Sequence, residues 1–186
     1  MVIKRDRINR TLSIDQSLYL SNVLKRFQME NCCAVSTPLE TGRKFCKRND
    51  DEAFDIKLYQ QAIGCLNYIC NTTRPDISAA VGVLSQFVTD PSVDHWTGVK
   101  RILRYLKGTL DYGLIFGDDG RNLLVGFSDA DWAGDIDSRR STSGYIFKLG
   151  NCLISWCSRK QATVAKSTTE AEYVSLSIAA QEAIWL

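Results

Sequence analysis

Two acidic side chains, 41 residues apart, are the residues of this sequence best placed for chemistry. Asp129 closes the apolar run that begins at Leu123, and Glu170 lies in the first turn of a helix expected to begin near Thr168. An acid at the end of a strand and an acid at the start of a helix can meet at one edge of a sheet, where carboxylate oxygens bind divalent cations. The sequence therefore predicts Asp129 and Glu170 as ligands of one metal ion.

Glu170 also has a purely structural explanation. Ser167 and Glu170 match the capping box, in which the glutamate at N3 reaches back to the backbone amide of the N-cap residue. A calcium loop starting at Asp129 is excluded because its fifth position is Ala133 and its twelfth is Arg140, where a bidentate glutamate belongs. The acids from Asp131 to Asp137 are interpreted as polar residues of a loop.

Composition indicates a globular protein of one or two domains. The 186 residues are 45% hydrophobic and 24% charged, and no run approaches the ~18 apolar residues of a membrane span. The seven cysteines have no metal-ligand spacing, and their odd number favours free thiols over a disulfide framework. The lone His95 has no identifiable catalytic partner and is interpreted as structural. We expect a protein that is not secreted.

Positive charge is concentrated near the N-terminus. Residues 1–48 carry ten Lys and Arg against four Asp and Glu, a net +6. A bias of this kind can mark a surface that meets nucleic-acid phosphates, or an ordinary solvated face. Lys100, Arg104 and Lys107 form a second basic group on one predicted helix, where they can contact a phosphate backbone or favour the helix dipole.

Helical patterns dominate the first 107 residues. A short hairpin is expected over residues 1–14, then a helix capped by Asp15 that buries Leu20, Val23, Leu24 and Phe27. A polar segment from Thr37 to Asp51 is interpreted as a linker and a plausible domain boundary. Helices follow over about 54–70, from Pro75 to a stop at Pro91, and over about 92–107.

From Asp111 the hydrophobic period changes to two. Strands are predicted over 113–116, 123–129, 144–149 and 152–158, with Gly150 and Asn151 as a hairpin turn. The sheet is therefore at least partly antiparallel. The last helix is apolar on several sides, as expected for a helix that packs on a sheet and is covered by further protein.

Seven motifs in order closely resemble the Pol polyprotein of copia-type LTR retrotransposons. They lie at Leu58 to Tyr68, Thr73 to Ile77, His95–Trp96, Lys100 to Thr109, Ser128 to Asp135, Arg139 to Tyr145 and Ser167 to Tyr173. The resemblance implies that residues 1–110 are the thumb and connecting region of a reverse transcriptase. Residues 111–186 would be the start of a ribonuclease H domain.

This resemblance implies a mixed α+β or α/β fold: a helical region followed by an incomplete ribonuclease H-like mixed sheet with a packed helix. Asp129 and Glu170 would be catalytic ligands of Mg²⁺ or Mn²⁺, and RNA–DNA hybrid or template–primer duplex would be the substrate. The family's third and fourth carboxylates would lie beyond Leu186, and no Tyr-x-Asp-Asp polymerase motif occurs. The resemblance therefore predicts weak metal binding and no activity for this fragment.

Two other functions are compatible with the sequence. The chain can be a nucleic-acid-binding remnant without catalysis, or a structural protein adopted by its host. The family implies the cytoplasm, within virus-like particles, and the nucleus as locations, the rest of the Pol polyprotein as a partner, and no membrane association. The strand ending at Asp129 would also present an unpaired apolar edge, which predicts poor solubility.

Overall fold

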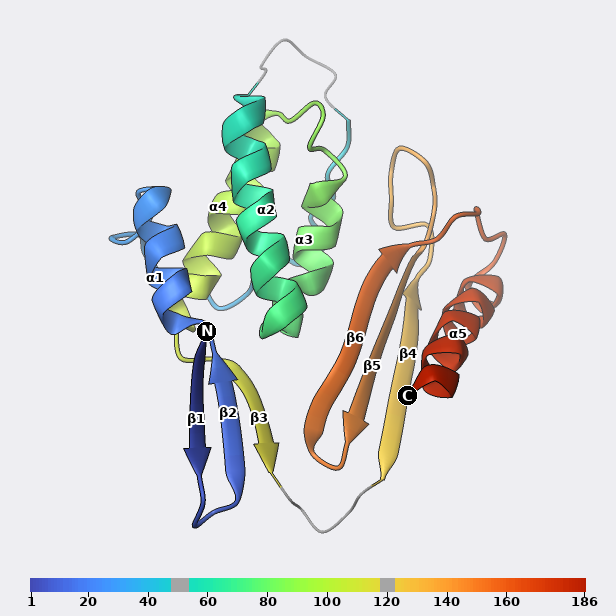
Figure 1. Ribbon diagram of the computed structural model, residues 1–186. Coiled ribbons are helices and arrows are strands. Elements are labelled where there is room, and N and C mark those ends of the chain that lie inside the picture. Colours follow the sequence, from blue (N-terminus) through green and yellow to red (C-terminus); the bar gives the residue numbers. More distant parts are fainter. Residues whose placement is uncertain (48–53, 118–122) are drawn as a thin grey trace. The chain divides into compact units, whose positions relative to one another are not determined.

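The computed structural model describes residues 1–47, 54–117 and 123–186. They form two compact units: the first comprises residues 1–3 and 14–113, and the second comprises residues 4–13 and 114–186. The described residues contain five α-helices and six strands (Figure 1). The mixed α+β class expected from the sequence is confirmed.

The first unit is helical. Its elements are α1 (Ser17–Arg26), α2 (Ile56–Thr72), the 3₁₀ turn η1 (Pro75–Ile77), α3 (Ser78–Ser85) and α4 (Val93–Gly108). Asp55 caps α2 by accepting the N–H groups of Lys57 and Leu58 at 2.9 and 3.2 Å. Two expectations were wrong in detail, because Pro75 opens a 3₁₀ turn before the short α3, and the N-cap of α1 is Gln16.

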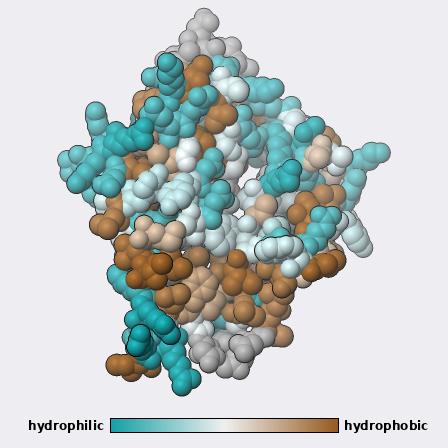
Figure 2. Space-filling view, viewed as in Figure 1, coloured by the Kyte–Doolittle hydropathy of each residue, from teal (hydrophilic) through white to brown (hydrophobic). Residues whose placement is uncertain are grey.

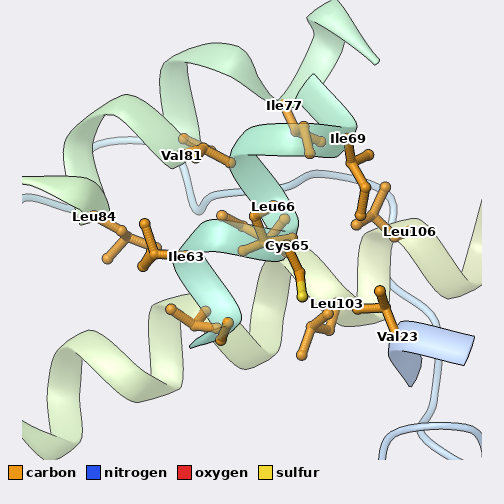
Figure 3. Packing of buried hydrophobic residues seen from close by; sticks show 14 of the residues in the cluster. Val23, Ile63, Cys65, Leu66, Ile69, Ile77, Val81, Leu84, Leu103 and Leu106 are labelled. Carbon is orange, nitrogen blue, oxygen red and sulfur yellow. The ribbon is translucent and has the colours of Figure 1, made fainter. Parts of the chain in front are cut away.

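The apolar stripes of α1 to α4 meet in one core. Figure 3 shows Leu66 and Ile69 of α2 close to Leu103 and Leu106 of α4, and each of these four side chains is at most 1% exposed. The residues expected to be buried in α1 are buried, from Leu20 at 1% to Phe27 at 8%. The domain boundary expected between Thr37 and Asp51 is not found, because residues 14–113 belong to one unit and Phe45 is buried in its core. Residues 48–51 of that segment lie outside the described residues.

The second unit contains a three-stranded antiparallel sheet in the order β4-β5-β6: β4 (Leu124–Asp131), β5 (Thr142–Leu149) and β6 (Cys152–Lys160). Leu149 pairs with Cys152, so Gly150 and Asn151 form the predicted two-residue turn, and Gly150 has a φ of 59°. Helix α5 (Thr168–Trp185) packs against β4 and β5 (Figure 1). The side of α5 expected to be covered is open in part: Leu176 is 54% exposed and Ile184 87%.

A second sheet, in the order β1-β2-β3, contains the predicted N-terminal hairpin. Its strands are β1 (Val2–Asp6), β2 (Thr11–Asp15) and β3 (Gly113–Gly117). Asp6 shapes the turn between β1 and β2, because its carboxylate accepts the N–H groups of Ile8 and Asn9 at 2.9 and 3.0 Å.

Candidate metal centre

Asp129 lies near the end of β4, which is at one edge of the β4-β5-β6 sheet. Its side chain is exposed, and its backbone oxygen accepts the Ser175 hydroxyl of α5 at 2.6 Å. Ser175 is 1% exposed and forms a small-residue stripe with Ala171 and Ala179, which lets α5 approach the sheet closely. The end of β4 and helix α5 are therefore joined at this residue, through Ser175.

The strand register places the Asp129 side chain on the face of the sheet opposite α5. The Gln161 amide donates to Ser143 Oγ and to the Ala171 carbonyl, both at 2.9 Å, so the Ser143 side chain lies on the face that α5 covers. Ala130 is paired with Ser143, so its side chain lies on the same face. Because successive side chains of a strand point to opposite faces, the side chain of Asp129 lies on the face away from α5. Because β4 is an edge strand in the described sheet, its outer edge is accessible from both faces.

Glu170 is used by the start of α5. Its N–H donates to the Ser167 hydroxyl at 3.1 Å, which is the predicted N-cap contact. Its carboxylate accepts the Lys166 N–H at 2.7 Å, so it reaches one residue further back than the capping box requires. The role of Glu170 as a metal ligand stays a prediction, and its carboxylate already has a backbone partner.

Glu172 is the acid near the start of α5 that contacts β4. One of its carboxylate oxygens accepts the Ala130 N–H at 3.3 Å, directly after Asp129 in β4. Sequence reasoning missed this residue because Glu170 fitted the helix-start pattern. The available signal was the stripe of Ala171, Ser175 and Ala179 at helical spacing, which identifies the side of α5 that faces the strands.

The acids after Asp129 have separate roles. Asp131 was expected in a loop but is the last residue of β4, and its carboxylate lies where a side chain at Gly134 would stand. Asp135 forms an ion pair with Lys160 at 2.7 Å. Burial raises the pKa of Asp135, but hydrogen bonds from Lys160 and Ser138 outweigh it and hold this pKa below its ordinary value.

The donor set at the end of β4 suits a hard divalent cation. Asp129 and Glu172 offer carboxylate oxygens, the ligands that Mg²⁺ and Mn²⁺ prefer. Within residues 1–47, 54–117 and 123–186, no group of three or more His, Cys, Asp or Glu side chains is close enough to hold a metal ion. The described residues therefore provide at most a pair of carboxylates at this edge.

The basic group predicted on α4 is largely engaged within its own unit. Arg104 Nε donates to the Cys33 carbonyl at 2.7 Å, and the Lys107 ammonium donates to the Glu30 carbonyl. Lys100 borders a small cleft of about 220 Å³. Nucleic-acid contact by Lys100, Arg104 and Lys107 stays a prediction, and two of these cations already fix the segment after α1.

His95 has the structural role expected from the sequence. It is 1% exposed and stacks on Phe87 with ring centroids 3.9 Å apart. Its Nδ1 accepts the Ser92 N–H at 2.9 Å, which completes a capping box at the start of α4.

Comparison with known proteins identifies relatives over the whole chain. It is 45% identical over 192 residues to the retrovirus-related Pol polyprotein from transposon TNT 1-94 of Nicotiana tabacum, an alignment that covers 100% of this chain and 14% of that protein. It is 36% identical to the uncharacterized mitochondrial protein AtMg00810 of Arabidopsis thaliana, over 94% of this chain and 72% of the relative. No family model and no solved structure matches the chain.

A third relative has a name of another kind. The chain is 59% identical over 128 residues to the secreted RxLR effector protein 161 of Plasmopara viticola, which covers 69% of this chain and 90% of that protein. The pattern Arg-x-Leu-Arg occurs here once, from Arg101 to Arg104, inside α4. Leu103 is fully buried, and Arg101 pairs with Glu40 at 2.9 Å, so this tetrapeptide is part of the folded core of the first unit.

Among the described residues, no helix is long and apolar enough to cross a membrane.

Proposed function

The chain belongs to the retrovirus-related Pol polyproteins of copia-type transposons, and on this basis we propose a function for each of its parts. Residues 1–110 act as the thumb and connecting region of a reverse transcriptase. Residues 111–186 belong to a ribonuclease H-like domain that hydrolyses the RNA strand of RNA–DNA hybrids. The chain spans 14% of the tobacco polyprotein, so these activities are those of the longer protein.

The contact between Glu172 and β4 carries this proposal. It brings a second carboxylate to the residue next to Asp129, at a strand edge that a substrate can approach. We propose Asp129 and Glu172 as the ligands of a Mg²⁺ or Mn²⁺ ion at this edge. When bound, such an ion supplies Lewis-acid stabilisation of the phosphodiester oxygens and an activated water.

Glu170 then has a separate role as a positioning residue. By holding the Lys166 N–H, it fixes the first turn of α5 and so the direction in which Glu172 projects. The competing hypothesis is that Glu170 is the metal ligand, as the sequence predicts. Single substitutions of Glu170 and Glu172 distinguish the two hypotheses.

The test is a titration of the 186-residue chain with Mn²⁺, in which isothermal titration calorimetry measures the binding affinity. Asp129→Asn and Glu172→Gln should each abolish binding, whereas Glu170→Gln should leave it within about twofold and lower stability by ~0.5–1 kcal/mol as a weakened cap. Asp111→Asn, an exposed acid of the other unit, is the control. If Glu170→Gln lost binding and Glu172→Gln kept it, Glu170 would be the ligand. If all variants kept binding, the ion would not bind at this site.

Weak binding and undetectable cleavage are expected for this chain. Two metal ions carry four positive charges, and two carboxylates offset only part of that charge. Cleavage of a labelled RNA–DNA hybrid in Mg²⁺ should therefore be undetectable with the chain alone. Robust cleavage that Asp129→Asn abolishes would show that the described pair suffices.

A second candidate function is nucleic-acid binding without catalysis. The relative from Plasmopara viticola favours a role apart from catalysis by the whole polyprotein, because this chain covers 90% of that protein. Hybrid binding in EDTA with no cleavage in Mg²⁺, even when the rest of a Pol polyprotein is supplied, would support this function.

A further inference from the structure

A cleft of about 980 Å³ lies within the second unit, apart from Asp129 and Glu172. One wall is the β1–β2 hairpin, which contributes Arg5, Arg7 and Arg10. The opposite wall is the β5–β6 hairpin, and Phe116 of β3 also lines the cleft. Its volume is at the upper end of the range of about 300–1,000 Å³ that is usual for ligand sites.

Gly117 of β3 and Cys152 of β6, which both line the cleft, are in contact. The Gly117 N–H donates to Cys152 Sγ at 3.1 Å, and the thiol lies 3.4 Å from the Gly117 carbonyl oxygen. Cys152 is buried and begins β6, so these contacts attach the end of β3 to the β5–β6 hairpin. The cleft is therefore part of the fold of this unit.

Among the described residues that line the cleft, the cations outnumber the acids. Asp6 is the one acid among the described lining residues, and its carboxylate is occupied by the turn, where it accepts the Ile8 and Asn9 N–H groups and the Asn9 side-chain amide at 2.7 Å. None of the three arginines forms an ion pair with the described residues. Figure 2 shows hydrophilic residues gathered on the β1–β2 hairpin.

The opposite wall is apolar and includes Leu149 and Ile154. A site with cations on one side and an apolar, partly aromatic surface on the other suits a ligand that is anionic on one side and apolar on the other. Unpaired nucleotides are such ligands, since their phosphates are anionic and their base faces are apolar. A duplex does not, because its base faces are stacked inside and phosphates and sugars cover its surface.

We propose that this cleft binds single-stranded nucleic acid, with phosphates on Arg5, Arg7 and Arg10 and a base stacked on Phe116. This site is independent of the metal centre and does not require the ribonuclease function. It gives the second unit a site for an unpaired strand, separate from any site for an RNA–DNA hybrid.

Fluorescence anisotropy with a labelled single strand of about 12 nucleotides, within the usual site sizes of about 4–16, tests the proposal. The full chain is used in EDTA, so that metal binding plays no part. Three phosphate contacts predict that log K falls with log [salt] with a slope of about −2. The triple variant Arg5→Gln, Arg7→Gln, Arg10→Gln should lose at least tenfold in affinity and most of that slope.

Two further variants make the result specific. Lys25→Gln, Lys57→Gln, Lys166→Gln removes the same charge at exposed positions outside the cleft and should retain the parental affinity. Phe116→Leu keeps an apolar side chain but removes the stacking surface, and should weaken binding several-fold with an unchanged salt slope.

Three outcomes would overturn the proposal. These are equal losses in the two triple variants, an affinity unaffected by Phe116→Leu, or a duplex of the same length bound as tightly as the single strand. Asp129→Asn and Glu172→Gln should bind the single strand normally, so a failure of the metal site leaves this result unchanged. Far-UV circular dichroism checks that each variant is folded.

Discussion

The guanidinium of Arg74 and the carboxylate of Asp76 form a bidentate ion pair between residues only two positions apart. Arg74 Nε lies 2.9 Å from Asp76 Oδ1, and Nη2 lies 2.7 Å from Oδ2. Arg74 also donates to the Thr109 carbonyl at 2.8 Å and is 1% exposed. Arg74 therefore fastens the turn before α3 to the end of α4.

Removing the charge of Asp76 should strongly destabilise this unit. Asp76→Asn leaves the buried Arg74 cation without its counter-ion, which should cost about 1–3 kcal/mol. This is less than the ~3–5 kcal/mol of a fully buried pair, because the Asp76 side chain is 33% exposed. Urea denaturation measures this loss. Asp94→Asn is the matched control, because it breaks the more exposed Arg43–Asp94 pair and should cost under about 1 kcal/mol. Equal losses in the two variants would contradict the structural role of Arg74.

The same pair predicts how stability depends on pH. Burial alone would raise the pKa of Asp76, but the hydrogen bonds and charge of Arg74, with the Tyr105 hydroxyl, hold this pKa below its ordinary value. A carboxyl with a lowered pKa in the folded state stabilises the protein above its unfolded pKa of about 4, and this stabilisation is lost as the pH falls through the folded pKa. The free energy of unfolding should therefore decline below about pH 4, and less steeply in Asp76→Asn. Parallel pH profiles for the two proteins would contradict this prediction.

Gly126 should not tolerate a side chain. A Cβ atom there would collide with the ring of Phe147, which is paired with Gly126 across β4 and β5 and is 4% exposed. Gly126→Ala should cost about 1–3 kcal/mol through overpacking. The double variant Gly126→Ala, Phe147→Leu should recover part of that loss, which a double-mutant cycle in urea detects. An additive double variant would show that the ring is not the cause.

The outer edge of β4 should mediate association between copies of the chain. β4 is an edge strand in the described sheet, and Phe127 is 57% exposed on the face opposite α5. An exposed apolar edge strand is a template for pairing with another chain, and a lysine there blocks it. Phe127→Lys should lower the fraction of dimers and larger species in sedimentation velocity. Leu176→Lys, at 54% exposure on α5, is the control and should change association less.

The elements of this fold could be predicted from the sequence because periodicity reports which side of an element is buried. The stripe of Leu20, Val23, Leu24 and Phe27 and the turn at Gly150 are local signals, and both are confirmed. The choice between Glu170 and Glu172 could not be made locally. Both acids lie in the first turns of α5, and only the packing of Ala171 and Ser175 on β4 decides which one reaches the sheet.

The charge of Arg74 is the clearest case of a role that no local pattern indicates. Nothing in the sequence around Pro75 indicates that this cation is buried, because its partner Thr109 lies 35 positions away. Contacts between distant segments decide such roles, and a hydrophobic pattern carries no information about them.

Residues 4–13 belong to the second unit, although residues 14–113 separate them from the rest of it. This unit cannot be completed until both ends of the intervening segment have been synthesised and brought together, and closing so long a loop slows folding more than it lowers stability. A fragment cut at the expected boundary before residue 111 would lack the β1–β2 hairpin and one wall of the arginine-lined cleft. During translation this hairpin is therefore complete long before β3, the strand that β2 pairs with, has been synthesised.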